Sequence, residues 1–577
     1  MNGSLVSSSE HQDKATRSTE RRTLALRLSF MVVAILLPAL IASFAAPSAF
    51  GQGFKVTDLD APGNVNGTYP LGLNTAGAVV GEYENSTGGT SGFYYNGTSF
   101  TELSYGGQNF TRGNGINDSN VVVGDFFGSD GLYHGFTYIS GTFQQYDVGV
   151  ESNVSTSLFG INKAGDFVGS WVPLETRVEE GFISPGGRGG KVTSFYAAGT
   201  DSTYAYAIDS SDNAVGAYVD TKGVTHCFAR QAANGVITTI DYPGSIATVC
   251  YGINDSGLIT GTYTNKSGLS YGFTYAVKTK TFAPTDFAGT RGVNSKGAYA
   301  GWYWGVDGFP SGYLAVPQAF NLTAVKLPNS KSSFLNGVNN ANVGVGSYVD
   351  SSGAQHGLMA TLTTIKAIDD PKGPTVCYAI NSGNVVVGDY FDSGGNPHGF
   401  QYSNGTFSDI PGPSDALSSD ATGINDAGVV VGDYFSGNDR THHGFIYQNG
   451  QYTVVDVPAA LATFSGGINK SGLATFSWID FDGYRQSSLY NGSTFPLINV
   501  PGAAITQAQG INSAGNIVFF WSDPYGVGHA ALKEGNSYYV FDEPKGTNAA
   551  GAGINDSNLI VGSFTLTGGL ELFYGTM

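Results

Sequence analysis

The stretch "GINDAGVVVGDYF", residues 423–435, decides the fold because the chain writes it repeatedly. A near copy, "GINDSNVVVGDFF", occupies 115–127, and "INSGNVVVGDY" occupies 380–390. We number each copy from its Asn, which we call position zero. Position zero recurs twelve times, at steps of 40 to 47 residues, if Asp209 is counted in the one place where Asn is missing. A fixed period of this size is typical of solenoids and propellers.

The residues around position zero predict a tight hairpin turn. Position zero is Asn74, Asn117, Asn162, Asp209, Asn254, Asn294, Asn339, Asn381, Asn425, Asn469, Asn512 and Asn555. Three residues later the chain has Gly, Asn or Asp in every unit, and these residues tolerate a positive φ. Two residues before zero it has only Gly or Ala, which indicates that little space exists there.

Two later positions indicate a packed strand. Position seven is Gly in ten units, with Phe476 and Phe519 as the exceptions, and position nine is aromatic in all twelve. The two positions share one face because side chains alternate along a strand. We therefore expect large rings to pack where another backbone comes close, with the position-nine aromatics in the core between sheets.

The rest of each unit adds two more strands. "HGFTY" (134–138) and "HGFQY" (398–402) are followed by tight turns and by segments such as "TFSDIPG" (406–412). Four antiparallel strands in about 44 residues is the size of one β-propeller blade. The sequence therefore predicts an all-β protein, a β-propeller built from twelve four-stranded repeats.

The ends of the repeat region predict how the propeller closes. The segment 54–63 reads as a fourth strand without its three predecessors, whereas the last repeat has three strands and no fourth. We expect strand 54–63 to pair with the last repeat and so remove an open sheet edge. Residues 52–577 then form either two six-bladed rings that divide near 326–333 or one large ring.

The combination of "HGF.Y", "GIN..G..VG.Y" and "D.PG" resembles the HAF family of secreted bacterial repeat proteins, over residues 54–577. The units carry Gly where the family name has Ala, as in "HGF" at 443–445, and His529-Ala530 keeps the Ala. The resemblance implies secretion and a β-propeller-like repeat architecture. It supplies no catalytic residue and no defined activity.

The first 51 residues read as a signal peptide. Arg21, Arg22 and Arg27 precede the apolar run 28–46, and small residues follow it. The sequence therefore predicts export, with a secreted, extracellular or cell-envelope location. Twin-arginine export and an uncleaved anchor are alternatives, and no later segment is apolar enough to span a membrane.

The net charge and the number of cysteines limit which classes of partner, disulfide and metal site are possible. The net charge is −18, and no cluster of Lys and Arg follows residue 30. Nucleic acids and anionic lipids are therefore unsuitable partners, since both require basic patches. The three cysteines, Cys227, Cys250 and Cys377, allow at most one disulfide and no zinc site.

Histidine is interpreted as structural. Six of the eight histidines occupy the same place in their units, whereas a catalytic His would be unique to one unit. We expect the imidazole to bond a neighbouring turn or the Asn at position zero. The structural repeat positions are Asn74, Asn117, Asn254, Asn425, Asn555, His134, His398 and His443.

Position eight is the candidate functional position, because it points to the opposite face from position nine and its chemistry varies. Two pairs of carboxylates occupy it in adjacent units, and these suit Ca²⁺ or acid–base hydrolysis of a glycosidic bond as well as simple solvation. Four tryptophans are candidates for exposed rings that stack on sugars. The ligand-binding candidates are Glu82, Asp125, Trp302, Trp304, Asp389, Asp433, Trp478 and Trp521.

The regularity of the units favours a secreted, non-catalytic binding or adhesion propeller that recognises polysaccharide or a surface protein. Ca²⁺ is the one cofactor considered. A glycan hydrolase or lyase that uses a carboxylate pair is the first alternative. Its support is the insertion 171–190, which contains Glu175, Glu179 and Glu180. A structural coat protein is the second alternative.

Overall fold

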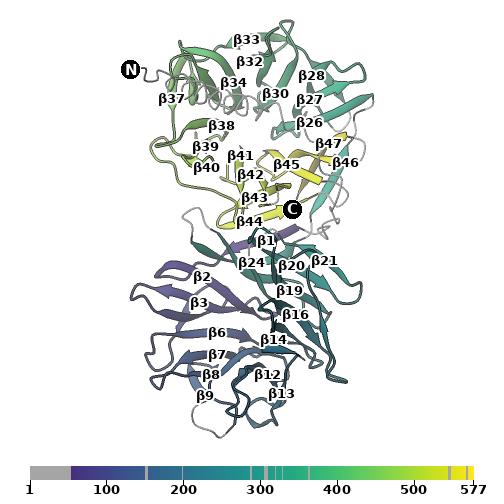
Figure 1. Ribbon diagram of the computed structural model, residues 1–577. Coiled ribbons are helices and arrows are strands. Elements are labelled where there is room, and N and C mark those ends of the chain that lie inside the picture. The colour runs from purple at the N-terminus through teal and green to yellow at the C-terminus, as the bar shows by residue number, and fades with distance from the viewer. Residues whose placement is uncertain are drawn as a thin grey trace, which may run out of the picture. The chain divides into compact units, whose positions relative to one another are not determined.

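The computed structural model describes residues 53–149, 154–197, 199–285, 289–304, 309–318, 320–325, 327, 329–361, 364–524, 526–542, 547–566 and 569–576. Within these ranges the chain consists of 47 β-strands and one short 3-10 turn, Gly187–Gly189, which confirms the all-β prediction (Figure 1). No helix in these ranges is long and apolar enough to cross a membrane. The predicted signal peptide, residues 1–51, lies outside them.

The strands follow the repeat. The N-terminal set of six units, together with the strand that precedes it, comprises β1 (Gly53–Asp58), β2 (Asn64–Leu73), β3 (Val79–Asn85), β4 (Thr90–Tyr95), β5 (Phe100–Leu103), β6 (Thr111–Ile116), β7 (Val122–Phe127), β8 (Tyr133–Ile139), β9 (Thr142–Tyr146), β10 (Thr156–Ile161), β11 (Phe167–Trp171), β12 (Glu180–Ser184), β13 (Thr193–Phe195), β14 (Thr200–Ile208), β15 (Ala214–Asp220), β16 (Thr225–Arg230), β17 (Ile237–Thr239), β18 (Ala247–Ile253), β19 (Leu258–Thr264), β20 (Ser270–Ala276), β21 (Thr281–Pro284), β22 (Gly289–Val293), β23 (Tyr299–Trp304) and β24 (Pro310–Gln318).

The C-terminal set of six units is described together with β25, the strand that precedes its first unit. It comprises β25 (Asn321–Val325), β26 (Ser330–Val338), β27 (Gly344–Asp350), β28 (Gln355–Ala360), β29 (Ile365–Ile368), β30 (Thr375–Ile380), β31 (Val386–Phe391), β32 (Pro397–Ser403), β33 (Thr406–Ile410), β34 (Ala416–Ile424), β35 (Val430–Ser436), β36 (His442–Gln448), β37 (Gln451–Val455), β38 (Ala462–Ile468), β39 (Ala474–Ile479), β40 (Arg485–Tyr490), β41 (Ile505–Ile511), β42 (Ile517–Ser522), β43 (Gly528–Glu534), β44 (Ser537–Phe541), β45 (Thr547–Ile554), β46 (Ile560–Leu566) and β47 (Gly569–Thr576).

Most units form one antiparallel sheet of four consecutive strands, such as β6-β7-β8-β9 and β34-β35-β36-β37. One unit differs, because its sheet has the three strands β38-β39-β40. There the chain that follows β40 makes only an isolated bridge between Ser488 and Leu497. Pro496 stands beside that bridge and has no N–H to donate, which shortens the ladder.

The prediction that the N-terminal strand pairs with the last repeat is wrong. β1 pairs antiparallel with β24 of the sixth unit along its whole length, and its other edge pairs with β44. The last repeat is completed by β25, which pairs with β47. The reason is that the chain leaves the sixth unit after β24, so that strand's outer edge is open for β1. An eight-stranded sheet results, in the order β22-β23-β24-β1-β44-β43-β42-β41.

The hairpin prediction is confirmed. In the second unit the side chain of Asn117 accepts hydrogen bonds from the backbone N–H of Ser119 and Val121, each at 3.0 Å. Asn120, three residues after zero, has a φ of 56°. All twelve residues at that position have a positive φ, which explains the restriction to Gly, Asn and Asp.

The Asn at zero also links neighbouring units. Its Nδ2 donates to the backbone carbonyl of the next position zero, as from Asn74 to Asn117 at 3.2 Å. In the N-terminal set Asn294 donates back to Asn74 at 2.9 Å, and in the C-terminal set Asn555 donates back to Asn339 at 3.0 Å. We call these two series of hydrogen bonds the asparagine belts. They make the molecule a propeller-like repeat fold.

Small residues at position minus two allow the innermost strands to approach each other. A β-carbon at Gly72 would lie 2.9 Å from the Cα of Gly115 in the next unit. A β-carbon at Gly553 would lie 2.8 Å from the Cα of Gly337, the equivalent glycine in the first unit of the C-terminal set, which is the next unit around the belt. Any larger side chain would push adjacent units apart.

The exceptions at position seven are explained by a size exchange. Gly124 lies opposite Phe136 of the third strand, whose ring occupies the space that a β-carbon would need. Where position seven is instead Phe519, the opposite residue is Ala531. A ring therefore lies opposite nine of the ten glycines, with Leu358 opposite Gly346 as the exception, and the ring comes from the third strand and not from position nine.

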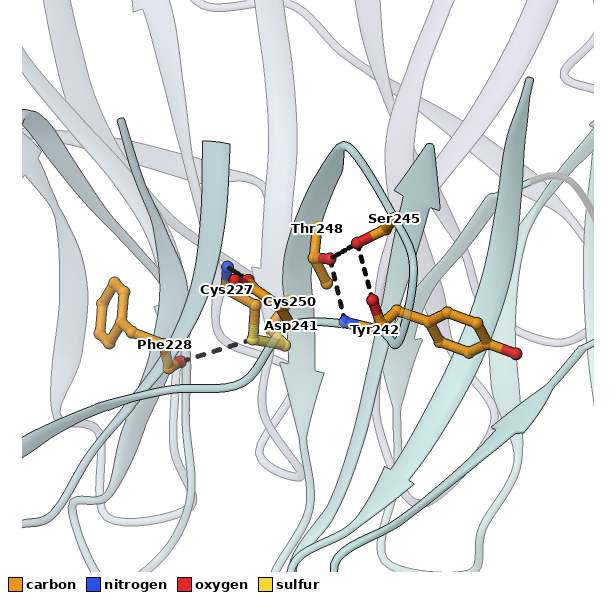
Figure 2. Close-up of a disulfide and its surroundings, with 7 residues drawn as sticks. All are labelled: Cys227, Phe228, Asp241, Tyr242, Ser245, Thr248 and Cys250. Atoms are coloured by element: carbon orange, nitrogen blue, oxygen red, sulfur yellow. Dashed lines mark hydrogen bonds between the residues drawn. A yellow bond between two sulfur atoms is a disulfide. The ribbon is translucent and has the colours of Figure 1, made fainter. Parts of the chain in front are cut away.

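One disulfide joins two adjacent sheets of the N-terminal set. Cys227 on β16 is bonded to Cys250 on β18 (Figure 2). Cys377 is a buried free thiol. Beside the bond, the Oγ1 of Thr248 accepts the backbone N–H of Tyr242 at 3.1 Å and so closes the loop that enters β18. A Thr six residues before zero makes the same bond in other units, such as Thr68 to Ala61 at 3.0 Å.

Candidate functional site

Position eight of each unit points toward the next unit. The indole of Trp302 lies 6.1 Å from the ring of Tyr69, and Glu82 lies 4.0 Å from Arg112. The contacted residues, Tyr69 and Arg112, each stand five residues before position zero of the unit that is next around the belt. Side chains at position eight therefore meet those at position minus five across the boundary between two sheets.

In the N-terminal set a guanidinium joins two carboxylates. Arg112 donates to Asp125 through Nε at 2.9 Å and through a terminal nitrogen at 2.7 Å. Asp125 is fully buried, whereas the side chains of Arg112 and Glu82 are 27% and 22% exposed. Burial raises the pKa of Glu82, and the charge of Arg112 opposes that rise. Arg112 thus occupies the place between the two carboxylates that a Ca²⁺ ion would need.

Aromatic rings continue this surface. Tyr69 meets Trp302 edge-on, and Trp302 meets Trp304 edge-on at 5.2 Å between ring centres. Trp304 is 60% exposed, and Trp302 and Tyr69 are partly exposed. We call Tyr69, Glu82, Arg112, Trp302 and Trp304 the N-terminal arc.

The insertion at 171–190 contributes to the same set. Glu179 accepts a hydrogen bond from Ser170 at position eight, at 2.7 Å, and its backbone carbonyl accepts the N–H of Thr203 at 2.8 Å. Burial, together with the nearby charge of Glu179, raises the pKa of Tyr204 to about 12. Glu175 is exposed, and Glu180 is half-buried with Thr176 as a hydrogen-bond donor at 3.3 Å.

Three residues before zero, the N-terminal set carries a series of side chains whose rings contact one another at tilted angles. Tyr206 lies 5.0 Å from Phe159 and 5.1 Å from Tyr251, measured between ring centres. The guanidinium carbon of Arg291 lies 3.4 Å from the centre of the Tyr251 ring. Bulky rings thus occupy the innermost strands of this set.

The C-terminal set uses the corresponding positions differently. Asp389 and Asp433 are both fully buried, so neither is the solvated strand residue that the sequence allowed. Asp433 Oδ1 accepts the backbone N–H of Ser465 at 3.0 Å and its hydroxyl at 2.8 Å. Asp389 Oδ1 accepts the backbone N–H of Ala421 at 3.1 Å. These carboxylates bind one sheet to the next.

A third carboxyl, which the sequence analysis missed, completes this group. Asp420 lies directly across the strand pair from Asp433 and is 8% exposed. Burial raises the pKa of Asp389 to about 7 and raises that of Asp420 well above its ordinary value. Asp389, Asp420 and Asp433 form the C-terminal acid cluster. The signal that could have revealed it is the presence of Asp at both position minus five and position eight of one unit.

The remaining tryptophans are not exposed platforms. Trp521 is fully buried against His529, with 4.6 Å between ring centres, so its predicted exposure is wrong. Trp478 is half-buried, and its indole N–H donates to Ser488 at 3.1 Å. Both stand at position nine, where Trp521 lies opposite His529 and Trp478 lies opposite Gln486 on the third strand.

Each repeated His is held by aspartates. His443 Nδ1 lies 2.8 Å from Asp456, and its Nε2 lies 2.9 Å from Asp439 in the neighbouring hairpin loop. Its ring also packs on Tyr434 at position nine. Burial lowers the pKa of His443, but the two hydrogen-bonded carboxylates outweigh burial, so the pKa is raised overall. His134 and His398 contact Asp130 and Asp392 in the same way.

Each asparagine belt encloses a small polar cavity. The cavity of the C-terminal set has a volume of about 110 Å³ and extends inward to Tyr378, Thr422 and Gln509. The cavity of the N-terminal set has a volume of about 90 Å³. In each unit its lining residues reach back along the chain only to the residue before position zero. No group of three or more His, Cys, Asp or Glu side chains in the described part of the chain is arranged to hold a metal ion.

Comparisons with known proteins leave the function open. A family model described as "Protein of unknown function (DUF3466)" matches residues 348–520. A search of curated proteins found no match. The resemblance to the HAF family therefore stays a prediction.

Solved structures with some likeness include AofleA from Arthrobotrys oligospora, which is 13% identical, with 45% of this chain and 84% of that chain covered and a TM-score of 0.30. TolB from Acinetobacter baumannii is 10% identical, with 52% and 79% covered and a TM-score of 0.30. Putative TolB from Agrobacterium tumefaciens is 9% identical, with 46% and 98% covered and a TM-score of 0.33. TM-scores this low identify neither a function nor a ligand.

Proposed function

We propose that this protein is a secreted, non-catalytic binding protein made of two closed six-bladed β-propellers, and that the N-terminal arc recognises a glycan. Three features support the architecture. Each asparagine belt returns to its first member after six units. The glycine contacts at position minus two return in the same way. β1 and β25 each complete a sheet whose unit has no fourth strand of its own.

The composition of the N-terminal arc carries the glycan proposal. Trp302 and Trp304 offer partly exposed indoles beside Tyr69, and Tyr69 is the cross-strand partner of Glu82, which meets Arg112 at the next boundary between sheets. Aromatic rings pack on the apolar faces of sugars, and charged side chains fix the orientation of a polar ligand. Among the ligand-binding candidates in the described residues, no others place a partly exposed aromatic ring and a partly exposed charged side chain on adjoining sheets.

Two features support export. The basic and apolar pattern of residues 1–51 is that of a secretory signal. The disulfide between Cys227 and Cys250 fits an oxidising compartment, since such bonds are rare in the cytosol.

The enzyme alternative has less support. A hydrolase that used Asp389 and Asp433 would need both carboxylates to reach the glycosidic bond, but both are fully buried and bonded to the next sheet. The coat-protein alternative predicts no soluble ligand at all, so a binding measurement separates it from the proposal.

The test is binding of the purified full-length protein to a glycan array, with and without Ca²⁺. We expect selective binding that Trp304→Ala reduces at least tenfold without a change in melting temperature, because Trp304 is 60% exposed. Phe481→Ala is the matched control, since Phe481 is an exposed aromatic residue of the C-terminal set, at 75%. Equal loss in both variants would remove the N-terminal arc as the site. No binding in either condition would remove the glycan proposal.

A further inference from the structure

The C-terminal acid cluster places three buried carboxyl groups together. Asp420 and Asp433 are paired residues of two adjacent strands, β34 and β35. Asp389, from the preceding sheet, bonds the backbone of Ala421, the neighbour of Asp420, and its carboxyl lies against that of Asp420. Like charges directly opposite each other in a sheet are destabilising, and burial increases the cost.

The hydrogen bonds of the cluster leave one oxygen without a donor. Asp389 Oδ1 accepts the Ala421 N–H, whereas the buried Oδ2 has no well-aligned hydrogen-bond donor among the described residues; the Tyr378 hydroxyl and the Asp420 carboxyl are the groups beside this carboxylate. The adjacent group that could supply a proton is the carboxyl of Asp420. A protonated carboxyl would donate its O–H to Asp389, satisfy that oxygen and remove one charge.

The surrounding groups do not neutralise the pair. His442 Nδ1 lies 3.3 Å from Asp433 Oδ2, and the charge of His442 also acts on Asp420. Arg485 is the guanidinium near Asp433, whose own negative charge acts on both Asp389 and Asp420. The remaining titratable neighbour of Asp389 is the hydroxyl of Tyr378, which is neutral. Asp389 and Asp420 are thus left to balance each other.

The N-terminal set shows what the missing cation would be. Glu82, Arg112 and Asp125 occupy the positions that Asp389, Asp420 and Asp433 occupy in the C-terminal set, at positions eight, minus five and eight of two consecutive units. Arg112 makes two hydrogen bonds to Asp125. Asp420 therefore replaces a guanidinium with a second acid at the same place in the unit.

We propose that Asp389 and Asp420 share a single proton and that this carboxyl pair is a pH-sensitive joint between two sheets of the C-terminal set. When the proton leaves, two adjacent buried anions remain and the contact between the sheets weakens. Water has a short route to the pair, since Tyr378 and Thr422 line the cavity of about 110 Å³ and Thr422 follows Ala421 in the chain.

The direction of the pH effect follows from the raised pKa values of both groups. A carboxyl whose pKa is higher in the folded than in the unfolded protein stabilises the fold at low pH. That contribution is complete below the ordinary carboxyl pKa and is lost as the pH rises through the folded value, which is about 7 for Asp389. Stability should therefore fall between about pH 5 and pH 8.

The test is urea unfolding of the full-length protein from pH 5 to pH 8.5, with Asp420→Asn as the variant. One shared proton predicts that the unfolding equilibrium constant rises about tenfold per pH unit from about pH 5 until the folded pair loses its proton near pH 7, and that it levels off above that pH. Asp420→Asn should remove this dependence, because Asn donates to Asp389 at every pH. Asp482→Asn, an exposed acid in the same set, should behave as the wild type. Identical pH dependence in wild type and Asp420→Asn would overturn the proposal.

A second measurement does not depend on the folding of a variant. Infrared spectra of the wild-type protein should contain the C=O band of a buried protonated carboxyl at pH 5, and the band should disappear by about pH 8.5. Absence of this band at pH 5 would refute the shared proton. A gain in stability on adding CaCl₂ at pH 8 would place a metal ion at the pair and would also overturn the proposal.

Discussion

Glu82, Arg112 and Asp125 of the N-terminal set and Asp389, Asp420 and Asp433 of the C-terminal set occupy equivalent strand positions, yet they differ in charge and in exposure. The first group is an ion-paired, partly exposed trio beside two tryptophans. The second is a buried cluster of acids. The difference shows that position in a repeat determines which neighbour a side chain meets, whereas the residue type of that neighbour determines the chemistry.

The largest expected effect comes from removing the cation of the N-terminal trio. Arg112→Met keeps the length of the side chain but leaves Asp125 buried without its partner. Breaking a buried ion pair in this way should cost about 3 to 5 kcal/mol in the free energy of unfolding. Urea unfolding at pH 7 measures it, and a second change, Asp125→Asn, should restore part of the loss. A loss below about 1 kcal/mol would mean that the pair behaves as a surface ion pair.

The disulfide is the second difference between the sets. Replacing Cys227 and Cys250 by Ala should cost about 3 kcal/mol, because the bond closes a loop with a sequence separation of 23 residues. Cys377→Ala is the control, since Cys377 stands at the same position in its unit as Cys250 but is a free thiol. Unfolding with and without a reductant should differ for the wild type and not for the double variant. Equal sensitivity to the reductant would place the stabilisation elsewhere.

The asparagine belts offer a smaller test. The N-terminal belt has Asp209 where the other units have Asn, so the carbonyl of Asn254 lacks the side-chain amide donor of the belt and keeps only the backbone N–H of Gly257, at 2.9 Å. Asp209→Asn would supply that donor and would remove a negative charge near Asp212, whose pKa burial and neighbouring acids raise. We expect a gain of about 1 kcal/mol, the usual net value of one hydrogen bond. A loss of stability in thermal unfolding would show that Asp209 has a role that the belt does not explain.

The smallest expected effect concerns the histidines. The pKa of His443 and of His356 is raised, despite burial that acts to lower it, by hydrogen bonds to aspartates. Each pair therefore stabilises the fold fully below the ordinary His pKa and loses this contribution as the pH rises through the folded value. NMR titration of the imidazole signals should give values above 6.5 for both. Values below 6.5 would mean that burial outweighs the aspartates.

Much of the fold could be predicted from the sequence because its causes are local. A positive φ three residues after zero restricts the residue type to Gly, Asn and Asp, so the turn is visible in every copy. The pairing of β1 was not predictable, since the segments 54–58 and 321–325 both read as fourth strands and nothing local says which sheet each completes.

The candidate site was harder to predict because its chemistry depends on the next unit. Asp125 and Asp389 look alike in sequence, but one meets Arg112 and the other meets Asp420. Trp521 and Trp304 differ in exposure because Trp521 stands at position nine, facing a His, whereas Trp304 stands at position ten, the last residue of β23. The Thr that closes the loop before the first strand was missed, although Thr recurs at that position in several units.

The place of β1 in the middle of an eight-stranded sheet has a consequence for biosynthesis. Of the strands in the described residues it is the first to leave the ribosome, but its partners are β24, which ends at Gln318, and β44, which ends at Phe541. During translation both of its edges stay open until most of the polypeptide exists, and contacts so distant along the chain form slowly. A ribosome that stops early therefore releases a polypeptide with unpaired strand edges, which are templates for aggregation.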